Sequence, residues 1–403
     1  MRPMTLDEIL APRSADDFLK NSWGKKFEHI KGYPGKFSEI LDWDSLNGIL
    51  RRQRMHTPQV RLARDGAIVP ISNVTQASPS GRTELVPSAL NKELRSGATL
   101  TIDFIHEVHD PITELAESLE RVFRQRVNVN AYAGWRSTHG FDLHWDEHDV
   151  LVLQIAGRKR WSVYGVTRPY PVSHRTDPEF PAPTEAIWED VVEEGDVLYL
   201  PRGWWHVAEA MDEPCLHLTF GISNRTGLDL LKWLKDELLE SEAFRQDLPR
   251  FAGEEEQAAH MNRLRAELME RFTPETLQAY FDDLDEKARP RPRFSLPWSA
   301  MPDALPPTDD HFVQMRACRD IELRDVHDGR SVEFRANGRR WRFAAAARDM
   351  LSKLLTGRPV SIASLLDGSD DELRASLRKL LSKMVVEDLV AVVAADETQL
   401  VHR

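Results

Sequence analysis

The chain has 403 residues, 41% hydrophobic and 29% charged, which is typical of soluble globular proteins and long enough for two or three domains. Its net charge of −12 argues against nonspecific nucleic-acid binding, which needs a basic face. No apolar run approaches the roughly 20 residues that span a bilayer, the N-terminus lacks the apolar core of a signal peptide, and two cysteines cannot build a disulfide framework. We therefore expect a cytoplasmic protein without a membrane partner.

Residues 1–225 are expected to form a mainly β domain. Ser14 and Asp17 form a capping-box pattern before a short helix, and residues 111–123 have the apolar spacing of a second helix. Six short β-type runs, separated by glycine and proline turns, lie between and after these helices. They span residues 99–105, 126–133, 150–155, 160–165, 196–201 and 215–222. Many short strands at such spacing predict an all-β barrel or sandwich.

The rest of the chain has a different character. Residues 226–289 are strongly helical, with apolar positions that fit either an internal core or a dimer seam, and the proline-rich residues 290–310 predict a linker. Residues 311–403 combine a hairpin at Asn337-Gly338 with three helices and a final strand, which is the order of a winged helix. Because 14 basic and 13 acidic residues nearly balance over 321–403, we expect a protein-binding or architectural role rather than DNA binding.

Two separated motifs carry the chemistry. His144-x-Asp146 places two ligand-type side chains on one face of an extended segment, because side chains repeat every two residues in a strand. The stretch GDVLYLPRGWWH, residues 195–206, has tight turns at Gly195 and Pro201 and sets His206 at the start of the next strand. Two histidines and one carboxylate make the facial triad of non-haem Fe(II) oxygenases, which leaves coordination positions open.

Several neighbouring residues allow more than one interpretation. In Arg158-Lys159-Arg160, either Lys159 or both arginines point into the barrel, and three adjacent cations also fit a solvated turn. Glu147 and His148 are expected at the surface or the rim. His217 and Thr219 fit either support of the metal site or simple packing.

Together these motifs resemble the JmjC-type 2-oxoglutarate oxygenases, specifically the ribosomal-oxygenase branch. The resemblance is most specific in NVNAYAG (128–134), HWDEHDVLVLQIAGRKRWSVYG (144–165), GDVLYLPRGWWHVAEA (195–210) and CLHLTFG (215–221). It implies a double-stranded β-helix of the cupin and JmjC type, followed by a helical dimerisation segment and a C-terminal winged helix. A homodimer is therefore expected.

The resemblance also implies roles for individual residues. His144, Asp146 and His206 correspond to the Fe(II) ligands, and Lys159 to the basic residue that pairs with the distal carboxylate of 2-oxoglutarate. Asn130 and Tyr132 match residues on a strand that lines the same pocket.

The implied activity is a dioxygenase that uses O2 and 2-oxoglutarate to hydroxylate a protein side chain. The expected substrate is a basic ribosomal protein, modified at arginine or histidine. The same chemistry on a small peptide or natural product, or N-methyl-lysine demethylation, stays open. A non-oxidative metal-binding cupin and a winged-helix DNA-binding regulator are the alternatives from other functional classes.

Overall fold

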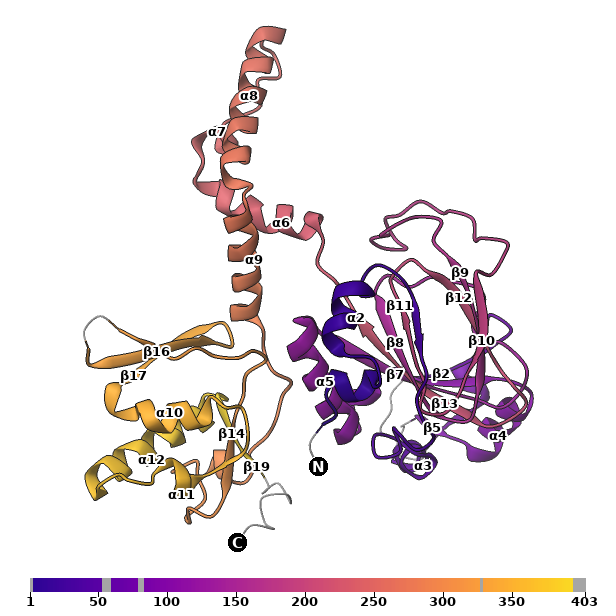
Figure 1. The fold of residues 1–403 in the computed structure, drawn as a ribbon, viewed down its shortest axis with the longest axis horizontal. Helices are drawn as coiled ribbons and strands as arrows, with labels where there is room; N and C mark the ends of the chain where they lie inside the picture. The colour runs from indigo at the N-terminus through magenta and orange to yellow at the C-terminus, as the bar shows by residue number, and fades with distance from the viewer. Residues whose placement is uncertain (1–2, 53–58, 79–82, 327–328, 394–403) are drawn as a thin grey trace. The chain divides into compact units, whose positions relative to one another are not determined.

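The structure is a computed structural model and describes residues 3–52, 59–78, 83–326 and 329–393. The chain divides into two compact units, Pro3–Asn224 and the residues from Arg225 onward (Figure 1). Within the described ranges, no helix combines the length and the apolar character that crossing a membrane requires.

The N-terminal unit is built on two principal antiparallel sheets that enclose a cavity. The large sheet contains, in spatial order, β1 (Glu28–Ile30), β11 (Val197–Leu200), β8 (Asp149–Ala156), β13 (Cys215–Ile222), β7 (Val127–Gly134), β6 (Thr99–Ile102), β2 (Val60–Arg64) and β3 (Ala67–Val69). The smaller sheet contains β10 (Trp188–Val192), β9 (Lys159–Gly165) and β12 (Trp205–Ala210). A separate hairpin consists of β4 (Thr75–Ala77) and β5 (Thr83–Leu85). The predicted β-rich domain is therefore present.

Alternation along β8 divides its side chains between two apolar environments. Leu151 and Leu153 belong to the larger core, which also contains buried residues of five α-helices, whereas Val150 and Val152 pack with β9 and β11 in a smaller core. The five helices are α1 (Leu6–Leu10), α2 (Ala15–Asn21), α3 (Trp43–Arg51), α4 (Pro87–Arg95) and α5 (Asp110–Phe123). Two short 3-10 helices, η1 (Ile71–Asn73) and η2 (Ile105–Glu107), complete this unit. One face of the large sheet is thereby sealed by helices and the other is left for the cavity.

The two helices and six strands predicted for this unit are present, with small differences at their ends. The Ser14 hydroxyl accepts a hydrogen bond from the Asp17 backbone, as the capping pattern predicts. The strand expected over 99–105 ends at Ile102, because Phe104 adopts a left-handed backbone conformation with φ of 53° that no strand residue can keep. Strands β1, β2, β3, β4, β5 and β10 are additional to the predicted set, and β12 begins at Trp205, next to the strand start expected at His206.

The C-terminal unit begins with helices and ends in a small mixed region. Its helices are α6 (Gly227–Glu237), η3 (Leu238–Glu240), α7 (Glu242–Arg245), α8 (Glu254–Arg271) and α9 (Pro274–Lys287). After η4 (Trp298–Ala300) follow β14 (Phe312–Met315), β15 (Arg324–Asp325), β16 (Ser331–Ala336), β17 (Arg339–Ala344), η5 (Ala345–Ala347), α10 (Arg348–Leu354), β18 (Val360–Ser361), α11 (Ile362–Leu365), α12 (Asp371–Val386) and β19 (Val390–Val393). The predicted hairpin turns at Asn337 and Gly338, which both have positive φ.

Candidate metal centre

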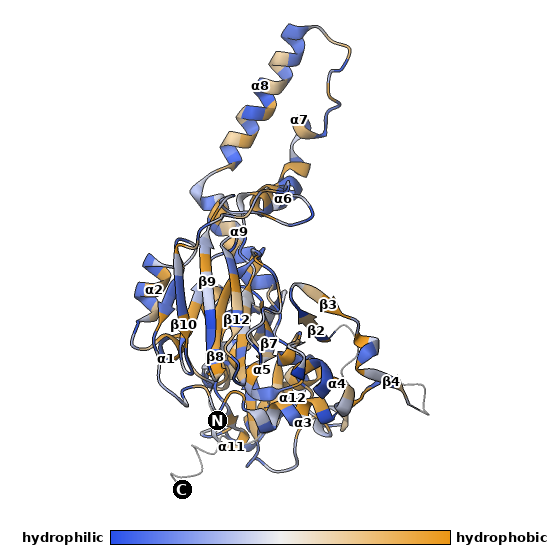
Figure 2. Ribbon diagram, turned by 90° about the vertical axis from the view of Figure 1, so that its right-hand side faces the viewer, coloured by the Kyte–Doolittle hydropathy of each residue, from blue (hydrophilic) through white to orange (hydrophobic). Residues whose placement is uncertain are grey.

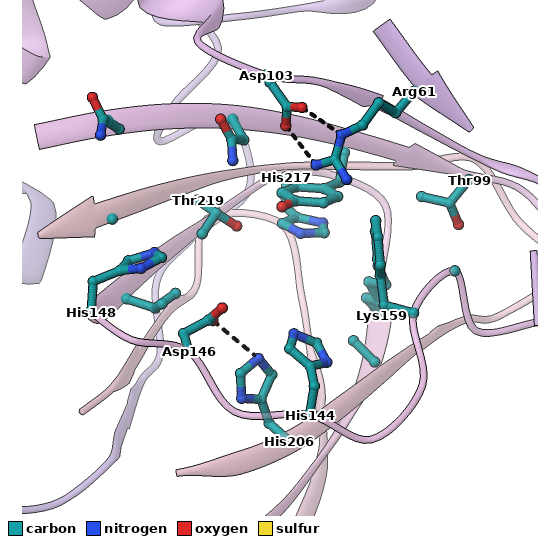
Figure 3. Close-up of a pocket in the computed structure, with 18 of the residues that line it drawn as sticks. Arg61, Thr99, Asp103, His144, Asp146, His148, Lys159, His206, His217 and Thr219 are labelled. Atoms are coloured by element: carbon teal, nitrogen blue, oxygen red, sulfur yellow. Dashed lines mark hydrogen bonds and ion pairs between the residues drawn. The ribbon is translucent and has the colours of Figure 1, made fainter. Parts of the chain in front are cut away.

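A cavity of about 510 Å³ lies between the two sheets of the N-terminal unit (Figure 3). Its walls come from β7, β8, β9, β12 and β13, and from residues 140–148 at the lip of β8. Polar side chains point into it from both sheets, while Val150, Trp161 and Ala208 contribute apolar surface. This volume lies within the range of roughly 300–1,000 Å³ that is usual for small-molecule sites.

His144, Asp146 and His206 come together on one side of this cavity. One ligand atom from each lies within 4.8 Å of the other two, and His206 Nε2 is 3.6 Å from Asp146 Oδ2. The backbones of His144 and His206 are also paired, with N–O distances of 3.1 Å and 2.8 Å in the two directions. A β-bulge between Trp205 and His206 interrupts the pairing of β12 with β9, and bulges of this kind re-aim side chains beside active sites.

Hydrogen bonds fix which ring nitrogens of the two histidines are free. Nδ1 of His144 is 2.7 Å from the Asp142 carbonyl oxygen, and Nδ1 of His206 is 2.9 Å from that of Trp204. A carbonyl oxygen only accepts, so each Nδ1 must donate, and Nε2 of the neutral ring keeps its lone pair. Metal-binding histidines commonly show this arrangement, because the second nitrogen orients the ring. The donor set therefore fits a metal ion.

The electrostatics favour the protonation states that bind a metal. Burial, followed by the neighbouring His144, lowers the pKa of His206 to about 4, although Asp146 opposes the shift. Burial acts to raise the pKa of Asp146, but the imidazoles of His206 and His144 outweigh it and lower that pKa. At neutral pH the group thus offers the neutral imidazole of His206 and the ionised carboxylate of Asp146.

Lys159 is the inward-pointing member of the three adjacent cations. Its side chain is 6% exposed, whereas Arg158 and Arg160 face outward and pair with Glu213 at 2.9 Å and Glu189 at 3.5 Å. Among the described residues, the Lys159 ammonium has no hydrogen-bond or ion-pair partner, and burial lowers its pKa. A buried cation without a partner is costly, so this end of the cavity is suited to an anion.

The same region contains other buried polar atoms without a protein partner. His217 Nδ1 and Trp161 Nε1 line the cavity, and neither has a hydrogen-bond partner within the described part of the chain. The His217 ring stacks on Tyr132, with ring centroids 4.9 Å apart. Together with the ammonium of Lys159 these groups fit a polar ligand such as a dicarboxylate.

Asn130 and Tyr132 both line the cavity on β7, and the structure gives them distinct surroundings. Asn130 Oδ1 accepts a hydrogen bond from the backbone N of Phe104 at 3.0 Å, so its oxygen is occupied. Burial, then the charge of Asp146, raises the pKa of Tyr132 to about 12, so the phenol stays protonated and can donate.

Sequence reasoning missed the contributions of Arg61, Asp103 and His148 to the cavity. Arg61 on β2 forms a two-point ion pair with Asp103, with Nε–Oδ2 and Nη2–Oδ1 distances of 2.5 Å and 2.7 Å. Neither residue lies in a motif, and β2 itself was not predicted. His148, expected at the surface or the rim, lines the cavity, and its ring lies where a Cβ on Gly221 would come within 2.5 Å. Its alternation with His144 and Asp146 was a usable signal.

Comparisons with known proteins agree with this geometry. A family model described as "JmjC domain" matches residues 104–230. The chain is 28% identical over 233 residues to a bifunctional lysine-specific demethylase and histidyl-hydroxylase NO66 of Brugia malayi, covering 56% of this chain and 32% of that protein. It is 29% identical over 258 residues to ribosomal oxygenase 1 of Rattus norvegicus, covering 60% of this chain and 42% of the relative. The chain thus spans less than half the length of these relatives.

A solved structure extends the similarity in fold to nearly the whole chain. The Escherichia coli ribosomal oxygenase YcfD matches with a TM-score of 0.57 and 17% identity, covering 98% of this chain and all of that one. Another structure of YcfD, in complex with cobalt and 2-oxoglutarate, matches with a TM-score of 0.52, 20% identity, and coverage of 94% and 97%. This chain therefore carries a JmjC domain over residues 104–230 and is similar to the ribosomal oxygenases.

Proposed function

We propose that this protein is an Fe(II)- and 2-oxoglutarate-dependent oxygenase that hydroxylates a side chain of a protein substrate. The observation that carries the proposal is a single cavity holding both the His144, Asp146 and His206 cluster and the buried, unpaired Lys159. Two imidazoles and one carboxylate suit Fe(II) and leave positions open. The cobalt and 2-oxoglutarate complex of the E. coli relative supports the same pair of ligands here.

In this proposal the residues of the chain bind the metal and 2-oxoglutarate and orient them. When bound, Fe(II) supplies the oxidation chemistry, with O2 and 2-oxoglutarate as cosubstrates. His144 and His206 present Nε2 because their Nδ1 atoms are held by backbone carbonyls, and Asp146 supplies the carboxylate. Lys159 pairs with the far carboxylate of 2-oxoglutarate. Trp161 and Val150 add apolar surface to the same cavity, which would limit the access of water to it.

The charges in the cavity favour a neutral target side chain. Its lining carboxylates, among the described residues, are Asp146, which belongs to the metal cluster, and Asp103, which is already paired with Arg61. The charges of Fe(II), Asp146, Lys159 and 2-oxoglutarate cancel, so no free carboxylate is left for a guanidinium or a methylated ammonium. A desolvated cation without such a partner is unfavourable. We therefore favour histidine over arginine, and hydroxylation over N-methyl-lysine demethylation.

The relatives that carry ribosomal oxygenase names support a ribosomal protein as the substrate. The test is to incubate the full-length protein with Fe(II), 2-oxoglutarate and total ribosomal proteins, then to map mass increases of one oxygen by peptide sequencing. We expect a single modified residue and succinate release in proportion. Modification of a small peptide or natural product alone, or loss of a methyl group instead, would support the alternative substrates. Metal binding without any dependence on 2-oxoglutarate would support a non-oxidative cupin.

We also propose that the helices over 226–289 join two copies of the chain. Figure 2 shows apolar residues spaced along α8, and large apolar side chains are exposed on several of these helices. The exposed large apolar residues of this segment are Leu228, Leu231, Leu239, Leu248, Phe251, Met261, Met269, Phe272, Leu277 and Phe281. That much exposed apolar surface on one segment is typical of an interaction surface.

The assembly prediction is a particle near twice 46.2 kDa in sedimentation at micromolar concentration. Leu231→Glu should give monomers. The Leu231 side chain is 45% exposed within one chain, and a charge at this position would remove an apolar contact between the two copies. Lys232→Glu, at an exposed position on the same helix, is the matched control and should stay dimeric. Leu234 is only 1% exposed within the chain and so belongs to the internal core, and a charge there would unfold the helices rather than test the interface. A monomeric native protein would contradict the proposal.

For the C-terminal region we propose a winged-helix-like domain with an architectural or protein-binding role. The order of hairpin, helices and final strand supports this assignment. Helix α12 begins with Asp370, Asp371 and Glu372, whose charges would repel phosphate at the helix start. Direct nucleic-acid binding is therefore disfavoured.

A further inference from the structure

A long connection contacts the segment that carries His144 and Asp146, and the proposed function assigns no role to it. Residues 166–187, here called the clasp loop, join β9 to β10 and contain neither helix nor strand. Connections of this length without secondary structure are uncommon inside compact domains and are usually functional. The segment His144–His148, here called the metal-binding segment, has side chains that alternate in direction, and this alternation decides which of them contact the clasp loop.

The odd-numbered residues of this segment hold the clasp loop, while the even-numbered ones line the cavity. Glu147 Oε1 accepts hydrogen bonds from Ser173 Oγ at 3.0 Å and from the backbone N of His174 at 2.5 Å. His174 Nε2 donates to the Trp145 carbonyl oxygen at 3.1 Å. The two residues that flank Asp146 are thus both tied to the clasp loop.

Ring stacking reinforces these hydrogen bonds. The Trp145 indole is 5% exposed and lies between His174 and Phe180, with ring centroids 3.7 Å and 5.4 Å away. Phe180 also meets Trp205 edge-on at 6.1 Å, and Trp205 Nε1 donates to Thr167 Oγ1 at 2.8 Å. Trp205 precedes His206, so one loop contacts the neighbours of both ligand-bearing segments.

The clasp loop has its own internal support. The Asp177 carboxylate accepts hydrogen bonds from the backbone N atoms of Val172 and Ser173 at 2.5 Å and 2.8 Å, and from Arg168 Nε at 2.6 Å. Its side chain is 4% exposed. The turn that presents Ser173 and His174 to Glu147 is therefore held by contacts within the clasp loop itself.

We propose that the clasp loop fixes the spacing of the metal ligands, and that Glu147 and Trp145 are positioning residues for the metal site. The inference rests on the proposed metal-dependent function. Glu147 acts here as a hydrogen-bond acceptor and not as a ligand, because its carboxylate is turned from the cavity and is occupied by Ser173 and His174. Losing such an outer partner weakens metal affinity about 10- to 100-fold in known sites.

The experiment titrates full-length apoprotein with Co(II), following its visible absorption, and records thermal unfolding of each variant. Glu147→Ala should weaken the Co(II) dissociation constant by roughly 10- to 100-fold. Glu147→Gln keeps an acceptor oxygen without the charge and should stay within about threefold of the native value. Glu179→Ala is the matched control, since Glu179 is exposed in the same loop and has no ion pair or hydrogen bond among the described residues.

The outcomes distinguish a positioning role of the clasp loop from simple attraction of the metal by the charge of Glu147. If Glu147→Gln and Glu147→Ala lose Co(II) affinity to the same extent, the negative charge attracts the metal, and the positioning role is overturned. Native affinity in Glu147→Ala would overturn it as well. If Glu147→Ala does not fold, Asp177→Asn, which loosens the clasp loop from within, should still weaken Co(II) binding, and unchanged affinity there would reject the proposal. A native protein that binds no Co(II) would instead reject the metal-dependent function itself.

Discussion

His144→Ala and His206→Ala should each abolish the release of succinate from 2-oxoglutarate while the protein stays folded. Each substitution removes one of three donors, and the remaining two cannot hold Fe(II) in a facial site. The fold should survive because the cores on both sides of the large sheet are made by other, apolar residues. The measurement is succinate release with Fe(II) supplied, alongside circular dichroism.

His139→Ala is a suitable control for this first prediction. His139 lies in the same lip before β8, but it pairs with Asp142 at 3.0 Å and does not line the cavity. Its removal should leave succinate release near the native rate. Near-native turnover in either His144→Ala or His206→Ala would show that the cluster is not the metal site.

Lys159→Ala should weaken the apparent affinity for 2-oxoglutarate by about 10- to 150-fold. A hydrogen bond to a charged group contributes roughly 1.5–3 kcal/mol, and about 1.4 kcal/mol corresponds to a factor of ten. Metal binding should persist, because the ammonium is not one of the three donors. Lys159→Arg should be milder than Lys159→Ala, although a planar guanidinium fits poorly in a pocket shaped for an ammonium. The measurement is the 2-oxoglutarate dependence of succinate release.

Arg158→Ala and Arg160→Ala are the controls on either side of Lys159. Their guanidinium groups pair with Glu213 and Glu189 on the outside of the barrel, so both variants should bind 2-oxoglutarate as the native protein does. Surface pairs of this kind contribute little to stability, so the fold should also be unaffected. A large loss in either arginine variant with none in Lys159→Ala would exclude Lys159 as the partner of the distal carboxylate.

The sequence could predict the parts of the site that depend on short-range geometry. His144 and Asp146 share a face because strand side chains alternate, and the turns before His206 mark the start of β12. Alternation also left two alternatives, with either Lys159 or both Arg158 and Arg160 pointing inward, and the same rule applied to His148 would have put it in the cavity wall.

The missing parts depend on contacts between distant segments. Arg61 and Asp103 meet only because β2 pairs with β6. The Asp65-Gly66 turn after β2 indicates its hairpin with β3 but says nothing of the pairing with the distant strand β6. The role of Glu147 was hidden for a similar reason, since its partners Ser173 and His174 lie in a loop without periodicity. Leu231 is exposed and Leu234 is buried, and this difference likewise depends on how α6 packs in its own unit.

The backbone pairing of His144 with His206 links metal capture to correct folding. These two residues are distant in the chain, yet two hydrogen bonds make them direct partners across the strands. A slip of one residue would turn every side chain of the displaced strand to the opposite face. Trp145 or Trp205 would then point toward the cavity in place of a ligand. Only a barrel closed in the right register offers all three donors. We therefore expect correctly assembled molecules to retain a metal through purification and compact molecules with a shifted strand to lose it.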